Sequence, residues 1–123
     1  MKARQQSGFT LIELVMVIVI LGILAVVAIP QFIDLRGEAR TGAVQGVAGA
    51  LGSAAAINYA ACQTDNAGLC TAVATGGACT LFNGLLQGGL PGAYTVTGTA
   101  PACTVELTAD TTVNATFVGL ATD

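Results

Sequence analysis

The chain has 123 residues, enough for a single domain, with 54% hydrophobic and only 9% charged residues and a formal net charge of −3. It contains no His and no Trp, which excludes histidine-based acid–base, triad and metal chemistry. Its four Lys and Arg residues are too few to form a nucleic-acid-binding surface, which needs clustered positive charge. We therefore expect a protein that is not an enzyme, with no catalytic residues, no cofactor, no metal and no nucleic-acid partner.

The first predicted element is a long apolar helix that follows a short, basic leader. The leader, Met1 to Gly8, carries Lys2 and Arg4, and residues 14–29 contain no charged or polar side chain. As a helix starting at Phe9, this segment is about 32 Å long, which is enough to span a bilayer core. Its one ionisable group is Glu13, and a carboxylate inside a membrane costs roughly 2.5 to 3.5 kcal/mol. The glutamate therefore needs a functional explanation.

These residues resemble the signature of type IV prepilins. Gly8 matches the last leader residue, Phe9 the first mature residue, Glu13 the fifth and Pro30 the twenty-second. The resemblance covers about residues 1–40, and beyond them it is only architectural. It implies a pilin fold of the α+β class, in which a long N-terminal helix packs under a small antiparallel sheet.

The resemblance also implies processing and assembly. In this family a membrane peptidase cuts after the glycine, here Gly8, and methylates the new amine, here that of Phe9. Subunits then leave the inner membrane, and their helices form the core of a filament in which the residue matching Glu13 pairs with a neighbouring subunit. Family filaments tend to lose helicity between the positions of Gly22 and Pro30. We therefore name Phe9, Glu13, Gly22 and Pro30 as assembly residues.

Physical chemistry also predicts an assembly role for Glu13, independently of the family resemblance. Cleavage before Phe9 creates an ammonium group one helical turn from the glutamate, and the two could pair within one chain. Between two chains, the same attraction would set the axial register. Two alternatives stay open, an uncleaved membrane anchor and a secretory signal cut farther along, although Ile29-Pro30-Gln31 is a poor site for such a cut. The basic leader places the N-terminus in the cytoplasm when the segment is inserted.

Residues 31–61 are predicted to continue the helix past Pro30, which should kink it without ending it. A charged collar of Asp34, Arg36, Glu38 and Arg40 marks the exit into water. Apolar residues then recur every three or four positions and form one stripe that should hold the strands: Val44, Val47, Leu51, Ala54, Ala55 and Tyr59. Small residues every four positions, from Gly42 to Ala54, permit close approach of another helix. The alternative is local flexibility without any assembly contact.

Residues 62–123 are predicted to form a small head. Residues 63–77 form a loop, 80–86 a short helix or strand, and 88–92 a turn. Alternating residues then predict three strands in a meander, over 94–97, 103–107 and 114–118, with threonines toward water. The whole chain thus divides into a leader (1–8), a membrane and filament-core helix (9–30), its amphipathic continuation (31–61) and the head (62–123).

Four cysteines, Cys62, Cys70, Cys79 and Cys103, all lie beyond the apolar segment. An even number of cysteines in a small exported domain indicates two disulfides in an oxidising compartment. Three pairings are possible, and the sequence alone does not choose among them. We favour Cys62 with Cys70, closing a short loop, and Cys79 with Cys103, tying the middle of the head to a strand. A metal site is the weaker alternative, because no C-x-x-C motif is present.

The function predicted from these features is that of a major pilin, a subunit that polymerises into a type IV pilus for adhesion, motility or surface attachment. Its expected partners are further copies of itself, the inner membrane before assembly, the prepilin peptidase and the pilus assembly machinery. Its expected location is the inner membrane as a precursor and then the extracellular pilus. Two alternatives remain, a type II secretion pseudopilin and a minor tip pilin that acts as a binding module.

Overall fold

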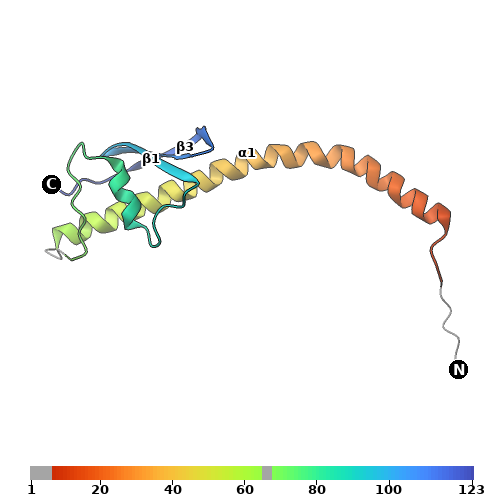
Figure 1. Ribbon diagram of the computed structural model, residues 1–123, viewed down its shortest axis with the longest axis horizontal. Helices are drawn as coiled ribbons and strands as arrows, with labels where there is room; N and C mark the ends of the chain where they lie inside the picture. The colour runs from red at the N-terminus through yellow and green to blue at the C-terminus, as the bar shows by residue number, and fades with distance from the viewer. Residues whose placement is uncertain (1–6, 65–67) are drawn as a thin grey trace, which may run out of the picture. The chain divides into compact units, whose positions relative to one another are not determined.

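A computed structural model describes residues 7–64 and 68–123, with the backbone alone at positions 33 and 34. Its elements are the α-helix α1 (Leu11–Gln63), the 3-10 helix η1 (Cys79–Leu85) and the strands β1 (Tyr94–Thr99), β2 (Ala102–Leu107) and β3 (Asp110–Val118) (Figure 1). The α+β class predicted from the sequence is confirmed. The leader residues Lys2 and Arg4 lie outside the described residues, as does the side chain of Asp34 in the predicted charged collar.

The chain divides into two compact units, residues 1–37 and residues 38–123, and α1 contributes to both. In the described part of the first unit, large hydrophobic side chains from Phe9 to Leu35 are exposed. Pro30 lies inside α1, which continues to Gln63, two residues beyond the predicted end. Within the described residues, α1 is the one helix whose length and composition would allow it to cross a membrane. We call the second unit, residues 38–123, the head.

The core of the head lies between α1 and the sheet. On α1 the buried positions are Val44, Ala48, Leu51, Ala55 and Asn58, at steps of three and four that keep them on one side of the helix. The predicted stripe is therefore correct at Val44, Leu51 and Ala55, and Val47 packs against this core while partly buried. It is wrong at Tyr59, which is 39% exposed, because the neighbouring Asn58 occupies the buried position in this turn.

The sheet is an antiparallel meander with the order β1-β2-β3, as predicted. Val96 of β1 pairs with Val105 of β2, and Cys103 of β2 pairs with Phe117 of β3. These four side chains are buried, so by strand alternation they share the inner face. All three strands are longer than predicted, because pairing extends into residues that the sequence pattern assigned to turns. The residues 80–86, left open between helix and strand, form most of η1 and place Phe82 in the core.

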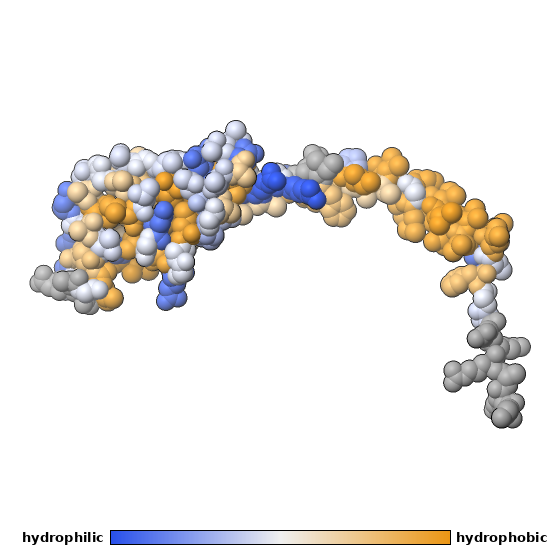
Figure 2. All heavy atoms as spheres, in the orientation of Figure 1, coloured by the Kyte–Doolittle hydropathy of each residue, from blue (hydrophilic) through white to orange (hydrophobic). Residues whose placement is uncertain are grey.

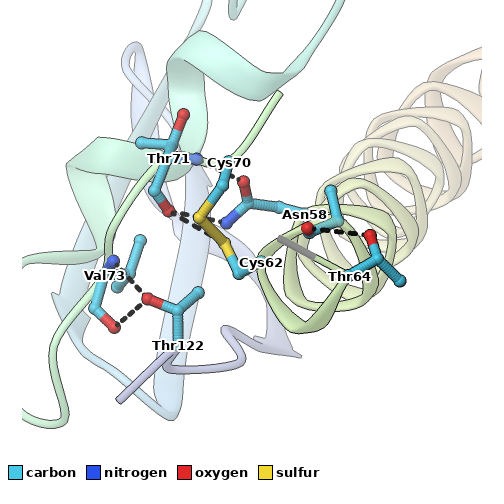
Figure 3. The surroundings of a disulfide bond; sticks show 8 residues. Asn58, Cys62, Thr64, Cys70, Thr71, Val73 and Thr122 are labelled. Carbon is cyan, nitrogen blue, oxygen red and sulfur yellow. Dashed lines mark hydrogen bonds between the residues drawn. A yellow bond between two sulfur atoms is a disulfide. The ribbon is translucent and has the colours of Figure 1, made fainter. Parts of the chain in front are cut away.

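Two disulfides and a side-chain clasp hold the loop segments of the head. Cys62 is bonded to Cys70, and Cys79 is bonded to Cys103, which are the two pairings favoured in the sequence analysis. Beside the first disulfide, the Asn58 amide donates to the backbone oxygen of Thr71 and accepts from its N–H, both at 2.8 Å (Figure 3). The clasp explains why a polar residue is buried there, since both ends of its amide are satisfied.

The glycine at position 119 is required by packing. A Cβ at this position would lie 2.6 Å from the Cys103 sulfur and would clash with the Phe82 ring. We expect Gly119→Ala to lower the free energy of unfolding by about 1 to 3 kcal/mol, because both neighbours are buried and cannot move away. Thermal or denaturant unfolding of the purified chain measures this change. Gly84→Ala is the matched control, since a Cβ at Gly84 meets nothing within 4 Å; equal losses from both substitutions would contradict the prediction.

Asp123 ties the segment after β3 to the loop before η1. Its carboxylate accepts from the Thr75 backbone N–H at 2.9 Å and from the Thr75 hydroxyl at 3.0 Å, and these bonds lower the pKa of the carboxyl. A carboxyl whose folded pKa lies below its unfolded value stabilises the fold above the unfolded pKa, and this contribution is lost as pH falls.

We therefore expect the melting temperature to fall as the pH drops below about 4, and to fall less steeply in Asp123→Asn. Asp110, whose pKa is lowered by hydrogen bonds from the Thr112 hydroxyl and backbone N–H, and further by the nearby charge of Arg40, accounts for part of the remaining slope. Melting curves of both proteins between pH 2.5 and pH 7 test this expectation. Superimposable pH profiles would show that Asp123 does not contribute.

Candidate assembly site

The residues around Glu13 form a capping box at the start of α1. The Glu13 backbone N–H donates to the Thr10 hydroxyl oxygen at 3.3 Å, while the Glu13 carboxylate accepts from the Thr10 backbone N–H at 3.1 Å. The Thr10 hydroxyl also donates to the same carboxylate oxygen at 3.0 Å. Each residue thus satisfies a backbone donor that the first helical turn leaves without a partner. The carboxylate is anchored within its own chain before any other subunit is involved.

Thr10 was missed in the sequence analysis, which considered only an ammonium group as a partner for Glu13. The capping box could have been recognised from the sequence, because Thr10-Leu11-Ile12-Glu13 has the S/T-x-x-E spacing of this motif just before an apolar run. The threonine therefore belongs to the candidate site together with the predicted residues.

The predicted processing residues lie directly before this capping box. Gly8 and Phe9 precede the helix in irregular structure, and Phe9 is 89% exposed. An open hollow of about 290 Å³ is lined by Phe9, Glu13, Leu14 and Val17. Gly8 and Phe9 are thus accessible, and the carboxylate lies at the edge of an apolar depression.

Gly22 and Pro30, the other two predicted assembly residues, lie farther along α1. Residues 22–30 are helical in the single chain, and a Cβ at Gly22 would meet nothing within 4 Å. The structure therefore does not bring these two residues to the capping box. Among the residues that the structure describes, no contact requires a glycine at position 22.

The surface of α1 beyond the capping box is hydrophobic (Figure 2). Exposed apolar side chains occur at nearly every position of this segment and so point in all directions around the helix: Leu11, Ile12, Leu14, Val15, Met16, Val17, Ile18, Val19, Ile20, Leu21, Ile23, Leu24, Val26, Val27 and Ile29. A helix that is apolar all round needs to be covered by lipid or by other helices. Such a segment can serve both as a membrane span and as a packing surface.

A second predicted packing surface is the glycine-rich side of α1 in the head. A Cβ at Gly42, Gly46 or Gly49 would meet nothing within 4 Å, so the fold of this chain does not require glycine there. Gly52 faces the Cβ of Phe117 at an ordinary contact distance of 3.8 Å. The open glycines leave room for the close approach of another helix, which stays a prediction.

Comparison with known proteins identifies the N-terminal motif. Residues 3–29 match the model of the prokaryotic N-terminal methylation motif. The chain is 53% identical over 51 residues to the type IV narrow pilus major component PilA5 of Thermus thermophilus, which covers 42% of this chain and 44% of that protein. It is 44% identical over 64 residues to the type II secretion system core protein G of Pseudomonas aeruginosa, covering 49% of this chain and 45% of that protein.

A third relative is the type IV major alpha-pilin of Moraxella bovis, with 51% identity over 41 residues, 33% of this chain and 26% of that protein. The chain thus spans less than half the length of the curated relatives it matches. No solved structure matches the chain. The amino-terminal segment of this chain thus carries the prokaryotic N-terminal methylation motif and is similar to type IV pilins and to a type II secretion core protein.

Proposed function

We propose that this protein is the major structural subunit of a type IV pilus. One observation carries the proposal: an acid held in a capping box begins a helix whose apolar side chains are exposed all round. In a monomer in water this surface would be unstable, whereas lipid and a bundle of equal helices both cover it. The match to a methylation motif and to a pilus major component supports the same reading.

The proposal includes an order of events. The precursor is anchored in the inner membrane by residues 9–30, with the leader, residues 1–8, in the cytoplasm. Cleavage after Gly8 and methylation at Phe9 produce the mature N-terminus, whose ammonium group pairs with Glu13 of a neighbouring subunit. Residues 31–61 continue the helix into the head, residues 62–123 complete the head outside the membrane, and Gly22 and Pro30 allow α1 to adjust on packing. The assembled filament lies on the cell surface.

A second candidate function is that of a type II secretion pseudopilin, which would build a short filament in the periplasm. The longer match favours it, since the similarity to the secretion core protein G extends over 64 residues, compared with 51 residues for the pilus major component. The two disulfides are compatible with either location, because the periplasm and the cell exterior are both oxidising. The higher identity to a pilus major component, 53% over 51 residues, favours the pilus.

Intact mass and N-terminal sequencing of the protein from sheared cell-surface filaments and from membranes test the proposal. We expect the sheared fraction to contain an abundant chain that begins at methylated Phe9. The same N-terminus confined to membranes would favour the pseudopilin. A chain that retains Met1 would overturn both candidates and indicate an uncleaved membrane anchor.

A further inference from the structure

The outer face of the sheet has a hollow of about 430 Å³. Its lining includes two cross-strand pairs, Ala102 with Val118 and Thr104 with Thr116, which alternate with the inward-facing Cys103 and Phe117. Val118 is 60% exposed although it is apolar. We call this depression the sheet hollow. A cavity of about 150 Å³ can hold a benzene-sized group, so the sheet hollow has room for two aliphatic side chains.

A second apolar surface of the head involves α1 and the loop closed by the first disulfide. Ile57 and Leu69 are each 71% exposed, and they border a smaller depression together with Leu85. These are the two most exposed large hydrophobic side chains of the described head residues. We call Ile57, Leu69 and Leu85 the apolar patch.

The two surfaces lie in different layers of the head. The sheet hollow lies on the face of β2 and β3 that points away from the core. Ile57 belongs to α1, and α1 runs along the other face of the sheet (Figure 1). One head therefore cannot bring its own apolar patch into its own sheet hollow. A contact between unlike patches on two copies is heterologous, and such contacts build open helical filaments when the rotation does not close a ring.

Charge limits where two heads can meet. The head contains one basic residue, Arg40, and five acids, so two heads carry like net charge and repel one another. The sheet hollow and the apolar patch contain no charged residue. Contact between them removes apolar side chains from water without bringing two acids together. Within this chain they are therefore suited to each other.

We infer that the apolar patch of one subunit docks into the sheet hollow of the next copy of this chain, as a contact between heads in the filament. The inference rests on the proposed function and adds the pair of surfaces that join the heads. Ile57 and Leu69 supply the inserted side chains, and Ala102, Thr104, Thr116 and Val118 line the receiving surface.

Introducing opposite charges on the two surfaces of the full-length protein tests this contact. We expect Leu69→Lys and Val118→Glu each to reduce the yield of sheared filaments by at least about tenfold, because either substitution buries an unpaired charge at the contact. In the double variant the lysine of one copy meets the glutamate of the next, and we expect the yield to return to within about threefold of the unmodified protein. Leu81→Lys and Thr111→Glu are matched controls at exposed positions outside both surfaces, and they should leave the yield unchanged.

Melting of each purified variant shows whether its head is folded, so loss of filaments with an intact head is attributed to assembly. Normal yields from both folded single variants, or a double variant no better than the worse single variant, would overturn the inference. If the unmodified protein itself gives no filaments, the proposed function fails instead. The two failures are therefore distinguishable.

Discussion

Replacing Glu13 by alanine is expected to abolish filaments while the precursor continues to accumulate in membranes. The substitution removes the one ionisable group of the apolar segment and with it the partner proposed for the mature N-terminus. A hydrogen bond to a charged group contributes about 1.5 to 3 kcal/mol, so its loss at every subunit should lower filament yield by at least about tenfold. The measurement is the ratio of sheared to membrane-bound protein in cells that express the variant.

Glu13→Gln separates the charge of this residue from its capping role. Glutamine can replace glutamate in a capping box, so the Thr10 hydrogen bonds and the start of α1 are retained while the charge is lost. We expect the glutamine variant to be as deficient in filaments as the alanine variant. Normal filaments from Glu13→Gln would show that the residue acts only as a helix cap. Thr10→Val, which removes the side chain of the cap but keeps the acid, should have the milder effect.

Loss of the buried disulfide is expected to prevent the head from accumulating as a folded unit. Cys79 and Cys103 are 0% and 1% exposed, and their bond joins η1 to the central strand β2. Removal of a native disulfide from a small exported domain typically costs about 2 to 5 kcal/mol, a large part of the stability of such a domain. Cys103→Ser also places a hydroxyl among apolar side chains. We expect this variant, and the double variant Cys79→Ser with Cys103→Ser, to be degraded.

The Cys62–Cys70 disulfide is expected to contribute less to the stability of the head. Cys62 and Cys70 are only partly buried and close a shorter loop, and the Asn58 clasp on Thr71 holds the same loop without them. We expect the double variant Cys62→Ser with Cys70→Ser to accumulate and to melt at a moderately lower temperature. Quantitative blotting of whole cells and melting of purified protein distinguish the two pairs. Equal accumulation of all variants would contradict the prediction that the Cys79–Cys103 disulfide contributes more to the stability of the head.

The parts of this fold that were predictable from sequence depend on local patterns. The long helix follows from an uninterrupted apolar run and a three-to-four spacing, and the meander follows from alternation in three short segments. The motif around Gly8, Phe9 and Glu13 could be recognised from the sequence because it is contiguous in the chain. The motif formed by Thr10 and Glu13 is equally short, but Thr10 was missed because only a charged group was considered as a partner for the acid.

The parts that were not predictable depend on contacts between segments distant in sequence. Asn58 is buried in place of Tyr59 because Thr71, thirteen residues away, offers both a backbone donor and an acceptor. Periodicity favours an aromatic residue over an amide at such a position. Gly119 cannot be recognised as a packing position until Phe82 and Cys103 lie beside it. The sheet hollow likewise needs the register of β2 against β3.

The capping box has a thermodynamic consequence for a subunit that moves between two surroundings. The Glu13 carboxylate accepts hydrogen bonds from Thr10 of its own chain, and in the proposed filament it would gain an ammonium partner in addition. The apolar side chains of α1 exchange lipid for helices that are equally apolar. On the proposed function, the apolar surface therefore contributes little to the difference in free energy between membrane and filament, and the bilayer can serve as a reservoir of subunits. The pair formed by Glu13 would then be the contact that favours the filament.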